Sequence, residues 1–413
     1  MKKFFAFFYW VMLFSLTCFI SCQNDDGTST VSKEERKSIV LSRSEEEMAA
    51  KNTDFALNLF KQIDTRQTEN WIASPLSASY ALGMMANGAS GKTLDEIMTT
   101  LGIGSSLEEM NAFHQKLTSE LEDLDNRVQL GIANSIWIDN DFPIYDSFKD
   151  INRNTYQAQI DNLDFASVDA LNIINDWIAQ QTNGHIEDAI KKIPDSTVVY
   201  LLNALYFQGG WKNKFEEKNT KDMNFTNADG STTQVKMMNQ LKVSLKCTQT
   251  PSYTIAELPF GNEAFSMTIL LPHEHKTIEG CMSELTSDEW ASWVAKTLKR
   301  PTNVWLPRFE LNAELDLTEV MQAMGVEEAF IIESADFSKM SIGLLYCSLF
   351  KQNSFLKINE EGAEVTTVTT SQMGGYGSAG PLAFKVDRPF AFFISEKSTG
   401  IILFMGKINK MHS

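Results

Sequence analysis

The sequence contains few residues whose types and spacing could perform catalysis. It has five histidines, and a Ser-His-Asp or Cys-His site needs a histidine that a third group orients toward a nucleophile. None of the five accompanies a GxSxG nucleophile elbow, and the sequence also lacks GxGxxG, the phosphate-binding P-loop and HExxH. We therefore predict that the protein is not an enzyme and uses no cofactor.

Two histidines, His273 and His275, are spaced so that both rings could reach one metal ion from an extended segment. They follow the apolar run FSMTILLP and lie in the polar sequence HEHKT, which is more typical of a turn. The cysteines after Cys22 are odd in number and lack metal-binding spacing. The sequence thus predicts neither a metal site nor a disulfide framework.

The stretch at 358–390 has no catalytic motif, but its composition would allow it to join a β-sheet. Its sequence is INEEGAEVTTVTTSQMGGYGSAGPLAFKVDRPF. No proline occurs at 359–380, so every backbone N–H there can take part in a ladder. Successive side chains of a strand point to opposite faces, which divides the segment into two sets. The small or β-branched, uncharged set is Ala363, Val365, Thr367, Thr369 and Ser371, and the other is Glu364, Thr366, Val368, Thr370 and Gln372. This pattern predicts that the segment can become a strand with one apolar face.

The first 22 residues have the features of a secretory signal, with a basic start, an apolar stretch at 4–20 and small or polar residues after it. Ser21 and Cys22, followed by QNDDG, are similar to a bacterial lipobox, in which the cysteine is lipidated, although Phe19 departs from the usual leucine. Residues 23–45 are polar and predict a flexible tether. We expect an extracytoplasmic protein anchored to a bacterial (outer) membrane through Cys22, with simple secretion as the alternative.

The chain is strongly acidic, with a formal net charge of −17. Loss of Lys2 and Lys3 with the signal leaves 34 basic and 53 acidic residues, a net charge of −19. Such a surface repels polyanions. We predict that the protein binds neither nucleic acid nor heparin.

The pattern of apolar residues indicates one large α+β domain that would present the 358–390 stretch. The chain is 43% hydrophobic, and no linker composition divides it after residue 45. Helical spacing occurs at 46–63, 76–86, 93–101, 107–121 and 169–181. Strand patterns occur at 128–138, 198–207, 243–258, 265–271, 304–311 and 344–358. The runs at 198–207 and 265–271 are apolar on both faces, which predicts central strands covered by helices.

Nine segments, in order along the chain, resemble those of the serpin family of protease inhibitors. They include NWIASPLSASYALGMMANGASGKTLDEI (70–97), INDWIAQQTNGHIEDAI (174–190), LLNALYFQGGWKNKFEEKNTKDMNF (201–225), VWLPRFELNAELDLTEVMQAMGV (304–326), INEEGAEVTT (358–367) and DRPFAFFISEKSTGIILFMGKI (387–408). The resemblance implies an α+β serpin fold of three β-sheets and eight or nine helices over residues 46–413. It also implies an exposed reactive-centre loop at about 360–382.

In that family a target protease cleaves the loop, which then inserts as an extra strand into the main sheet. The resemblance therefore implies a suicide-substrate inhibitor of serine endopeptidases, and by extension of cysteine endopeptidases. Fifteen steps from Gly362 to Gly377 extend roughly 50 Å at about 3.3 Å each, which could carry an attached protease across the domain and distort its acyl-enzyme. The alternative is a non-inhibitory serpin that acts as a surface binding protein, although the small residues after Gly362 favour inhibition.

The resemblance also assigns site residues. A polar cluster over which the main sheet opens comprises Ser74, Ser77, Asn203 and Gln352, with Trp211 at the point where the loop first enters. Gln352 stands where many members have histidine, so that histidine's pH sensitivity is expected to be absent. The loop hinge comprises Glu360, Glu361, Gly362, Ala363, Glu364, Val365, Thr366 and Thr367.

The reactive bond is predicted at Tyr376–Gly377, with Met373 and Ser378 as alternatives. Counting about sixteen residues from Glu360 leads to Tyr376, and counting back from Pro389 leads to Ser378, because the loop is two residues longer than usual. Tyr376 is large and has glycines on both sides, so it could enter a deep apolar pocket. Chymotrypsin-like or cathepsin G-like proteases are the expected partners, and the inhibitor is expected to act as a monomer.

Overall fold

The computed structural model describes residues 36–140, 142–186, 189–194, 197–363 and 380–412. Residues 36–413 form one compact unit. This unit begins earlier than the expected boundary at residue 46. Ile39 is 4% exposed and its amide donates to Ser398 Oγ at 2.9 Å, and the first helix, capped by Ser42, begins at Arg43. Residues 36–45 therefore belong to the folded domain and not to the tether.

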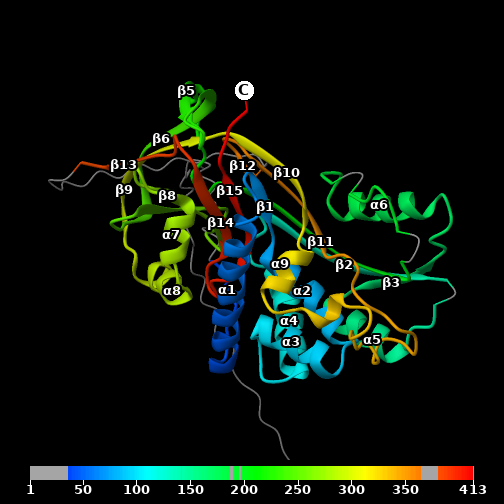
Figure 1. The fold of residues 1–413 in the computed structure, drawn as a ribbon. Coiled ribbons are helices and arrows are strands. Elements are labelled where there is room, and N and C mark those ends of the chain that lie inside the picture. The colour runs from blue at the N-terminus through cyan, green and yellow to red at the C-terminus, as the bar shows by residue number, and fades with distance from the viewer. Residues whose placement is uncertain (1–35, 141, 187–188, 195–196, 364–379, 413) are drawn as a thin grey trace, which may run out of the picture. The chain divides into compact units, whose positions relative to one another are not determined.

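Nine α-helices and two short 3-10 helices occur in the described part of the chain (Figure 1). The five helices predicted from helical spacing are present, within three residues of the predicted ends. Sequence patterns missed α5, α7, α8 and α9, which have only 6 to 11 residues each. No described helix is both long enough and apolar enough to cross a membrane. The helices are α1 Arg43–Asp64, α2 Pro75–Ala86, α3 Gly91–Leu101, α4 Leu107–Leu121, α5 Asp146–Tyr156, α6 Ala170–Gln181, α7 Ile278–Glu284, α8 Ser287–Lys296 and α9 Thr318–Ala323, with 3-10 turns η1 Glu217–Asn219 and η2 Glu328–Phe330.

Fifteen strands of the described chain form three sheets, as the fold class predicted. The largest has the order β1-β15-β14-β8-β7-β6-β9-β13, with β5 paired to β6; β10 and β11 form a second sheet, and β12-β4-β2-β3 form the third. The strands are β1 Trp71–Ala73, β2 Val128–Asp139, β3 Gln159–Leu163, β4 Val199–Gly210, β5 Lys221–Thr226, β6 Thr232–Gln249, β7 Tyr253–Pro259, β8 Phe265–Pro272, β9 Lys299–Pro307, β10 Phe309–Asp316, β11 Lys351–Ile358, β12 Gly362–Ala363, β13 Leu382–Lys385, β14 Phe390–Glu396 and β15 Ile402–Ile408.

Three strand predictions were wrong in their bounds. The predicted strand at 243–258 is divided between β6 and β7 by a turn that contains Pro251. The one at 304–311 is divided between β9 and β10 after Pro307, because Arg308 donates its amide to Lys236 of β6. Residues 344–350 are not a strand; the amide of Cys347 bonds to Ala329, which leads the chain away from β11. Proline and a competing loop contact thus override the apolar pattern.

Strand β4 is covered on both faces, which explains its continuous apolar sequence (Figure 1). Odd-numbered side chains, such as Leu201 and Leu205, contact the main core, to which α2 contributes. Even-numbered ones, such as Tyr200 and Leu202, pack in a second core with Trp177 of α6. The other strand predicted to be central, β8, is buried along its whole length between β7 and β14. Both predictions of a covered strand are confirmed.

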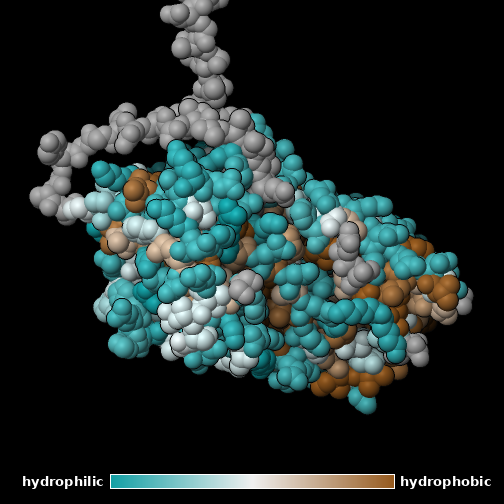
Figure 2. All heavy atoms as spheres, turned by 90° about the horizontal axis from the view of Figure 1, so that it is seen from above, coloured by the Kyte–Doolittle hydropathy of each residue, from teal (hydrophilic) through white to brown (hydrophobic). Residues whose placement is uncertain are grey.

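Exposed apolar side chains are concentrated on part of the surface. In the face shown in Figure 2, hydrophilic residues (teal) predominate and hydrophobic residues (brown) gather toward the end on the right. The chain exposes large apolar residues next to α6, where Val168 is 89% exposed, and between η2 and β11, where Leu344 is 87% exposed. The domain is therefore not uniformly polar on its surface despite its high net charge.

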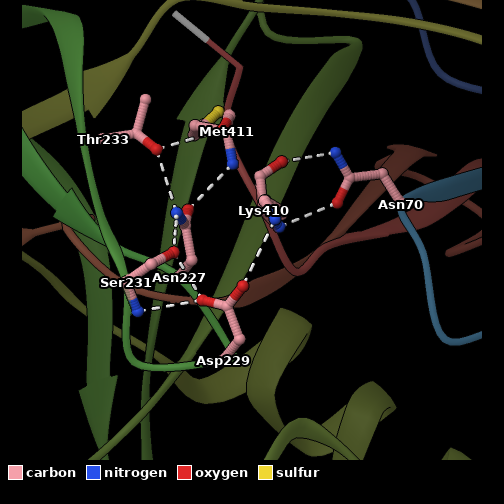
Figure 3. A network of polar contacts seen from close by, with 7 residues as sticks. All are labelled: Asn70, Asn227, Asp229, Ser231, Thr233, Lys410 and Met411. Atoms are coloured by element: carbon pink, nitrogen blue, oxygen red, sulfur yellow. Dashed lines mark hydrogen bonds and ion pairs between the residues drawn. The ribbon is translucent and has the colours of Figure 1, made fainter.

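A network of polar contacts ties down the C-terminal residues after β15 (Figure 3). Asn227, in the turn between β5 and β6, is 3% exposed and accepts a hydrogen bond from the amide of Met411 at 3.0 Å. Its side-chain amide also donates to Ser231 and Thr233, both at 2.9 Å. Asn70, just before β1, exchanges two hydrogen bonds with the backbone of Lys410. Hydrogen bonds from Asn70 and Asn227 therefore hold the C-terminal residues after β15 against the domain.

Replacement of Asn227 by alanine should destabilise the domain by about 2 kcal/mol, because it leaves a buried amide of Met411 and two hydroxyls without their partner. Urea unfolding followed by intrinsic fluorescence would measure this change. Lys410→Gln is the matched control, since Lys410 is 46% exposed in its ion pair with Asp229 and should change stability by less than about 0.5 kcal/mol. Equal effects of the two variants would contradict a buried clamp at Asn227.

Candidate functional site

The predicted hinge is paired with the sheet at its first residues. Gly362 and Ala363 form β12, antiparallel to β4 with Gly362 opposite Gly210. Gly362 has a φ of +122°, and an added Cβ would lie 2.4 Å from the carbonyl oxygen of Gly209 and 2.5 Å from the amide nitrogen of Trp211. Only glycine fits this backbone and this approach. The chain therefore turns into the sheet at Gly362.

Glu360 anchors the chain immediately before this turn. It is 6% exposed, accepts a hydrogen bond from Arg308 Nε at 2.8 Å and accepts another from the hydroxyl of Thr220. Burial raises the pKa of the Glu360 carboxyl, but the hydrogen bonds from Arg308 and Thr220 lower it more, so the net pKa is below its ordinary value. The contact adds stability above the ordinary carboxyl pKa and loses it as the pH falls through the lowered folded pKa. Glu360 and Gly362, which the expected exposed loop included, are therefore buried.

Trp211 holds the same turn from the other side. Its indole Nε1 donates to the carbonyl of Asn359 at 2.9 Å, and its amide donates to the carbonyl of Glu361 at 2.8 Å. The ring is 4% exposed and stacks on Phe260 with centroids 4.5 Å apart and planes at 9°. Trp211 therefore contacts the chain at Asn359 and Glu361, immediately before the hinge glycine.

The structure brings Ser74, Ser77, Asn203 and Gln352 together. The amide of Ser74 donates to Gln352 Oε1 at 2.6 Å, and Gln352 Nε2 donates back to the carbonyl of Ser74 at 2.9 Å. Ser77 donates its hydroxyl to Asn203 Oδ1, and its amide bonds to Ser74 Oγ at 3.1 Å. The start of α2 is thus joined to β4 on one side and to β11 on the other.

Sequence reasoning missed Asn134, which extends this cluster. Asn134 lies directly opposite Asn203 in the β2–β4 ladder and accepts a hydrogen bond from its side-chain amide. It is 2% exposed and donates to the carbonyl of Tyr156 at 2.7 Å. An asparagine in the apolar strand VQLGIANSIWI was the available signal, since a buried amide needs partners on both sides.

Sequence reasoning also missed His185, which follows α6. Its imidazole stacks on Tyr206 of β4, with ring centroids 5.2 Å apart and planes at 14°. It stacks as well on Phe355 of β11, at 5.1 Å and 19°. One ring therefore links β4 to β11 on the face that α6 covers.

Strands β4 and β11 are neighbours that share no ladder in the described structure. β4 pairs with β2 along one edge and with β12 at the end of the other, whereas β11 pairs with β10. A cavity of about 110 Å³ lies between the two strands, lined by residues that include Ser77, Tyr200, Asn203, Phe350 and Gln352. We call the space between the facing edges of β4 and β11 the slot. A strand that paired with both edges would satisfy their backbone groups.

Two histidines considered for chemistry have structural contacts. His114 is buried, with its ring nitrogens 3.1 Å from Ser79 Oγ and 3.0 Å from the Tyr156 hydroxyl, and burial lowers its pKa to about 3. His273 follows β8 in a turn, with Nε2 3.0 Å from Thr254 Oγ1. Within the described ranges, no three His, Cys, Asp or Glu side chains are grouped to hold a metal ion.

Several predicted site residues lie outside the described residues. They are Glu364, Val365, Thr366 and Thr367 of the hinge, Met373, Tyr376, Gly377 and Ser378 around the reactive bond, and Cys22 of the lipid anchor. The reactive bond and the anchor therefore stay predictions from the sequence.

Comparisons with known proteins agree with this geometry. A family model described as serpin, serine protease inhibitor, matches residues 50–411. Rat glia-derived nexin is 32% identical over 374 residues, which cover 87% of this chain and 92% of the relative, and human neuroserpin is 31% identical over 373 residues, 86% and 90% of the two chains. The chain belongs to the serpin family, whose members are generally protease inhibitors.

Solved serpin structures share the fold closely. The thermophilic serpin tengpin, in its native state, superposes with a TM-score of 0.81 at 29% identity, covering 91% of this chain and 96% of its own. Human thyroxine-binding globulin, solved with thyroxine, also gives 0.81, at 26% identity and 90% and 100% coverage. The same fold thus occurs in proteins named for quite different activities.

Replacement of Gly362 by alanine should break the pairing of β12 with β4, because the new Cβ would overlap backbone atoms at a strained φ. We expect a loss of about 2 kcal/mol or more in the free energy of unfolding. Gly380→Ala is the control, since no atom lies within 4 Å of the position of its Cβ. Melting of both variants, followed by circular dichroism, would test whether Gly362 is required for the pairing of β12 with β4. A Tm of Gly362→Ala similar to that of wild type would contradict this requirement.

Proposed function

We propose that the protein is a suicide-substrate inhibitor of serine endopeptidases whose cleaved loop fills the slot between β4 and β11. The observation that carries this proposal is β12, which already pairs with β4 at one end of the slot. The loop continues directly from β12, so its next residues can extend the same ladder along the free edge of β4. Family membership supports the class of activity.

Two independent registers agree on where the loop would pair. The β12–β4 register, continued along β4, opposes Thr369 to Asn203. The bridge between Asn359 and Gly362 sets the register toward β11, and its continuation opposes Thr369 to Gln352. In both registers Thr369 would therefore meet the polar cluster that links α2 to the two strands.

The same register fits the two faces of the loop to their surroundings. Val365 would oppose Phe207 and Thr367 would oppose Leu205, both of which face the main core. Glu364, the only charged residue at 363–372, would oppose Gln208, which is half-buried on the other face. Small, uncharged side chains thus meet the core, where a charge would be costly.

Trapping follows from the length of the inserted strand. An acyl-enzyme attached at Tyr376 would be moved by roughly 50 Å, at about 3.3 Å per residue. A protease pressed against the far end of the domain loses the alignment of its triad and oxyanion hole, so deacylation stalls. A tyrosine at the reactive bond supports chymotrypsin-like or cathepsin G-like targets, and papain-like cysteine proteases as a further class.

The proposed location is outside the cytoplasm, with Cys22 lipidated in a bacterial (outer) membrane. The signal-like residues 1–22 and the lipobox-like Ser21-Cys22 support this proposal. The tether then comprises residues 23–35, since the folded unit begins at residue 36. Such a protein would protect a cell surface from proteases, and radiolabelled palmitate incorporation that Cys22→Ala abolishes would test the anchor.

A second candidate is a non-inhibitory serpin that binds a partner at the surface. It is favoured by the close structural match to thyroxine-binding globulin, which was solved with thyroxine. The two candidates differ in what cleavage of the loop does. Insertion stabilises an inhibitor strongly, whereas an inert loop changes the melting temperature little.

The test is to mix the protein lacking residues 1–22 with chymotrypsin and to separate the products by denaturing gel electrophoresis. A denaturation-resistant complex and a released peptide that starts at Gly377 are expected. Cleavage without a complex by chymotrypsin, elastase, trypsin and papain would reject inhibition in favour of the second candidate. A peptide that starts at Gly374 or Ala379 would move the reactive bond to Met373 or Ser378.

Thr367→Arg should convert the inhibitor into a substrate, because its side chain would enter the main core beside Leu205. We expect the number of inhibitor molecules consumed per trapped protease to rise by about tenfold or more, as an unpaired charge is buried. Glu364→Arg is the matched control on the opposite face and should leave this stoichiometry almost unchanged. Titration of chymotrypsin with both variants measures it, and equal effects would show that the loop does not insert in this register.

A further inference from the structure

Two paired strands, β6 and β9, carry a local excess of positive charge in a strongly acidic chain (Figure 1). The chain has a formal net charge of −17, yet β6 contains three basic residues, β9 contains two, and neither strand contains an acidic one. We call residues 241–246 of β6, together with the neighbouring residues 298–303, the basic ribbon. Its basic residues are Lys242, Lys246, Lys299 and Arg300.

The positive charges in and around the basic ribbon lie close together. Lys246 stands directly opposite Lys299 in the β6–β9 ladder, and like charges in such a pair weaken a sheet. Burial lowers the pKa of Lys246, and three nearby cations lower it further: Lys397, Arg36 and Lys299. Glu257 opposes them, but it is already paired with Lys397. Positive charge around Lys246 therefore exceeds what the nearby carboxylate balances.

The other carboxylate beside the basic ribbon is also shared with a lysine from outside it. Glu263 forms ion pairs with both Lys212 and Lys299. Lys242 and Arg300 are exposed, and neither forms an ion pair within the part of the chain that the structure describes. Their charges are therefore available to an anionic partner.

Two leucines are exposed beside these charges. Leu298 is 83% exposed and Leu241 is 62% exposed. Among the described strands β13 pairs with β9 only from Thr302 onward, so residues 299–301 form a free edge. Basic residues and proline at such an edge discourage strand pairing, but this protection does not call for exposed leucines. Basic side chains next to aliphatic ones are instead typical of a surface that binds at the lipid headgroup level.

The chain enters its folded unit at the same surface. That unit begins with Arg36, which lies close enough to Lys246 to lower its pKa, although burial lowers it more. Under the proposed location, residues 23–35 join Arg36 to a lipid on Cys22. A flexible segment of this length spans about 20 Å on average. The anchor would therefore keep lipid headgroups within reach of the basic ribbon and raise their effective concentration there.

We propose that the basic ribbon docks on anionic phospholipid headgroups of the membrane that anchors the protein. Lys242 and Arg300 bind phosphates, and Leu298 enters the headgroup region. This inference rests on the proposed lipid anchor at Cys22 and adds a membrane contact made by the folded domain itself. A flexible tether alone leaves the domain free to rotate, whereas a second contact fixes its orientation. Because β13 pairs with β9, docking also keeps the C-terminal end of the reactive-centre loop near the membrane.

Vesicle sedimentation with the protein lacking residues 1–22 tests this docking, since any binding then comes without the lipid anchor. We expect binding to vesicles of equal parts phosphatidylglycerol and phosphatidylcholine, none to phosphatidylcholine alone, and release by salt. The double variant Lys242→Gln, Arg300→Gln should lower the partition coefficient by about 25-fold, because each basic residue contributes about fivefold. Leu298→Ser should lower it by about tenfold.

The matched control is the double variant Lys51→Gln, Lys191→Gln. It changes the net charge by the same amount at two exposed lysines that lie elsewhere, each paired with a carboxylate, and should bind vesicles as wild type does. An equal loss of binding in the control would show that only net charge matters and would overturn the proposal. So would no binding by wild type, or binding of soluble heparin as tight as that of vesicles together with no effect of Leu298→Ser.

Titration of chymotrypsin without vesicles separates this inference from the proposed function. The ribbon variants should form the covalent complex with wild-type stoichiometry, because the basic ribbon contributes no residue to the slot. If no complex forms but vesicle binding depends on the ribbon, inhibition fails and the docking stands. If a complex forms and vesicle binding does not depend on the ribbon, inhibition stands and the docking fails. Ribbon-dependent binding without palmitate incorporation would reject the anchor and leave the docking surface in place.

Discussion

The facing backbone edges of β4 and β11 are the constraint on which the rest of the site depends. A polar backbone group without a partner costs about 1 to 3 kcal/mol when it is buried, and no ladder joins these two neighbouring edges within the described residues. Gln352 and Asn203 connect the edges to α2, β12 fills the first position, and His185 joins the side chains above them. Each contact holds the arrangement in place without completing the sheet. Under the proposed function, the uncleaved fold is stable and a cleaved loop would still complete the sheet.

Much of the fold could be predicted because buried apolar residues recur in the sequence with the period of the helix or strand to which they belong. The five helices of the first half have apolar residues at helical spacing, and β4 and β8 are apolar at consecutive positions because they are covered on both faces. The assembly of Ser74, Ser77, Asn203 and Gln352 could not come from such patterns, since they lie far apart in the chain. It was predicted from the family resemblance, and the structure brings them together.

What escaped prediction depends on pairings between distant segments. In the sequence, His185 is a single polar residue after a helix. Its contacts with Tyr206 of β4 and Phe355 of β11 exist only in the folded structure. Asn134 gains its role from the β2–β4 register, which sets it opposite Asn203. By contrast, a proline marks each of the breaks near Pro251 and Pro307 in the sequence, and the apolar residues on both sides do not keep the strand continuous. The short helices α7 and α9 contain too few turns for a reliable period.

The order of strands in the large sheet also affects how the chain reaches its fold. β14 and β15 lie between β1 and β8, although they are the last strands in the sequence. A growing or threading chain cannot complete this sheet until its C-terminal end has arrived, because the central places stay empty. Completion of the sheet is thereby delayed until the whole polypeptide is present. If the protein is exported as proposed, the chain would cross the membrane before this sheet could be completed.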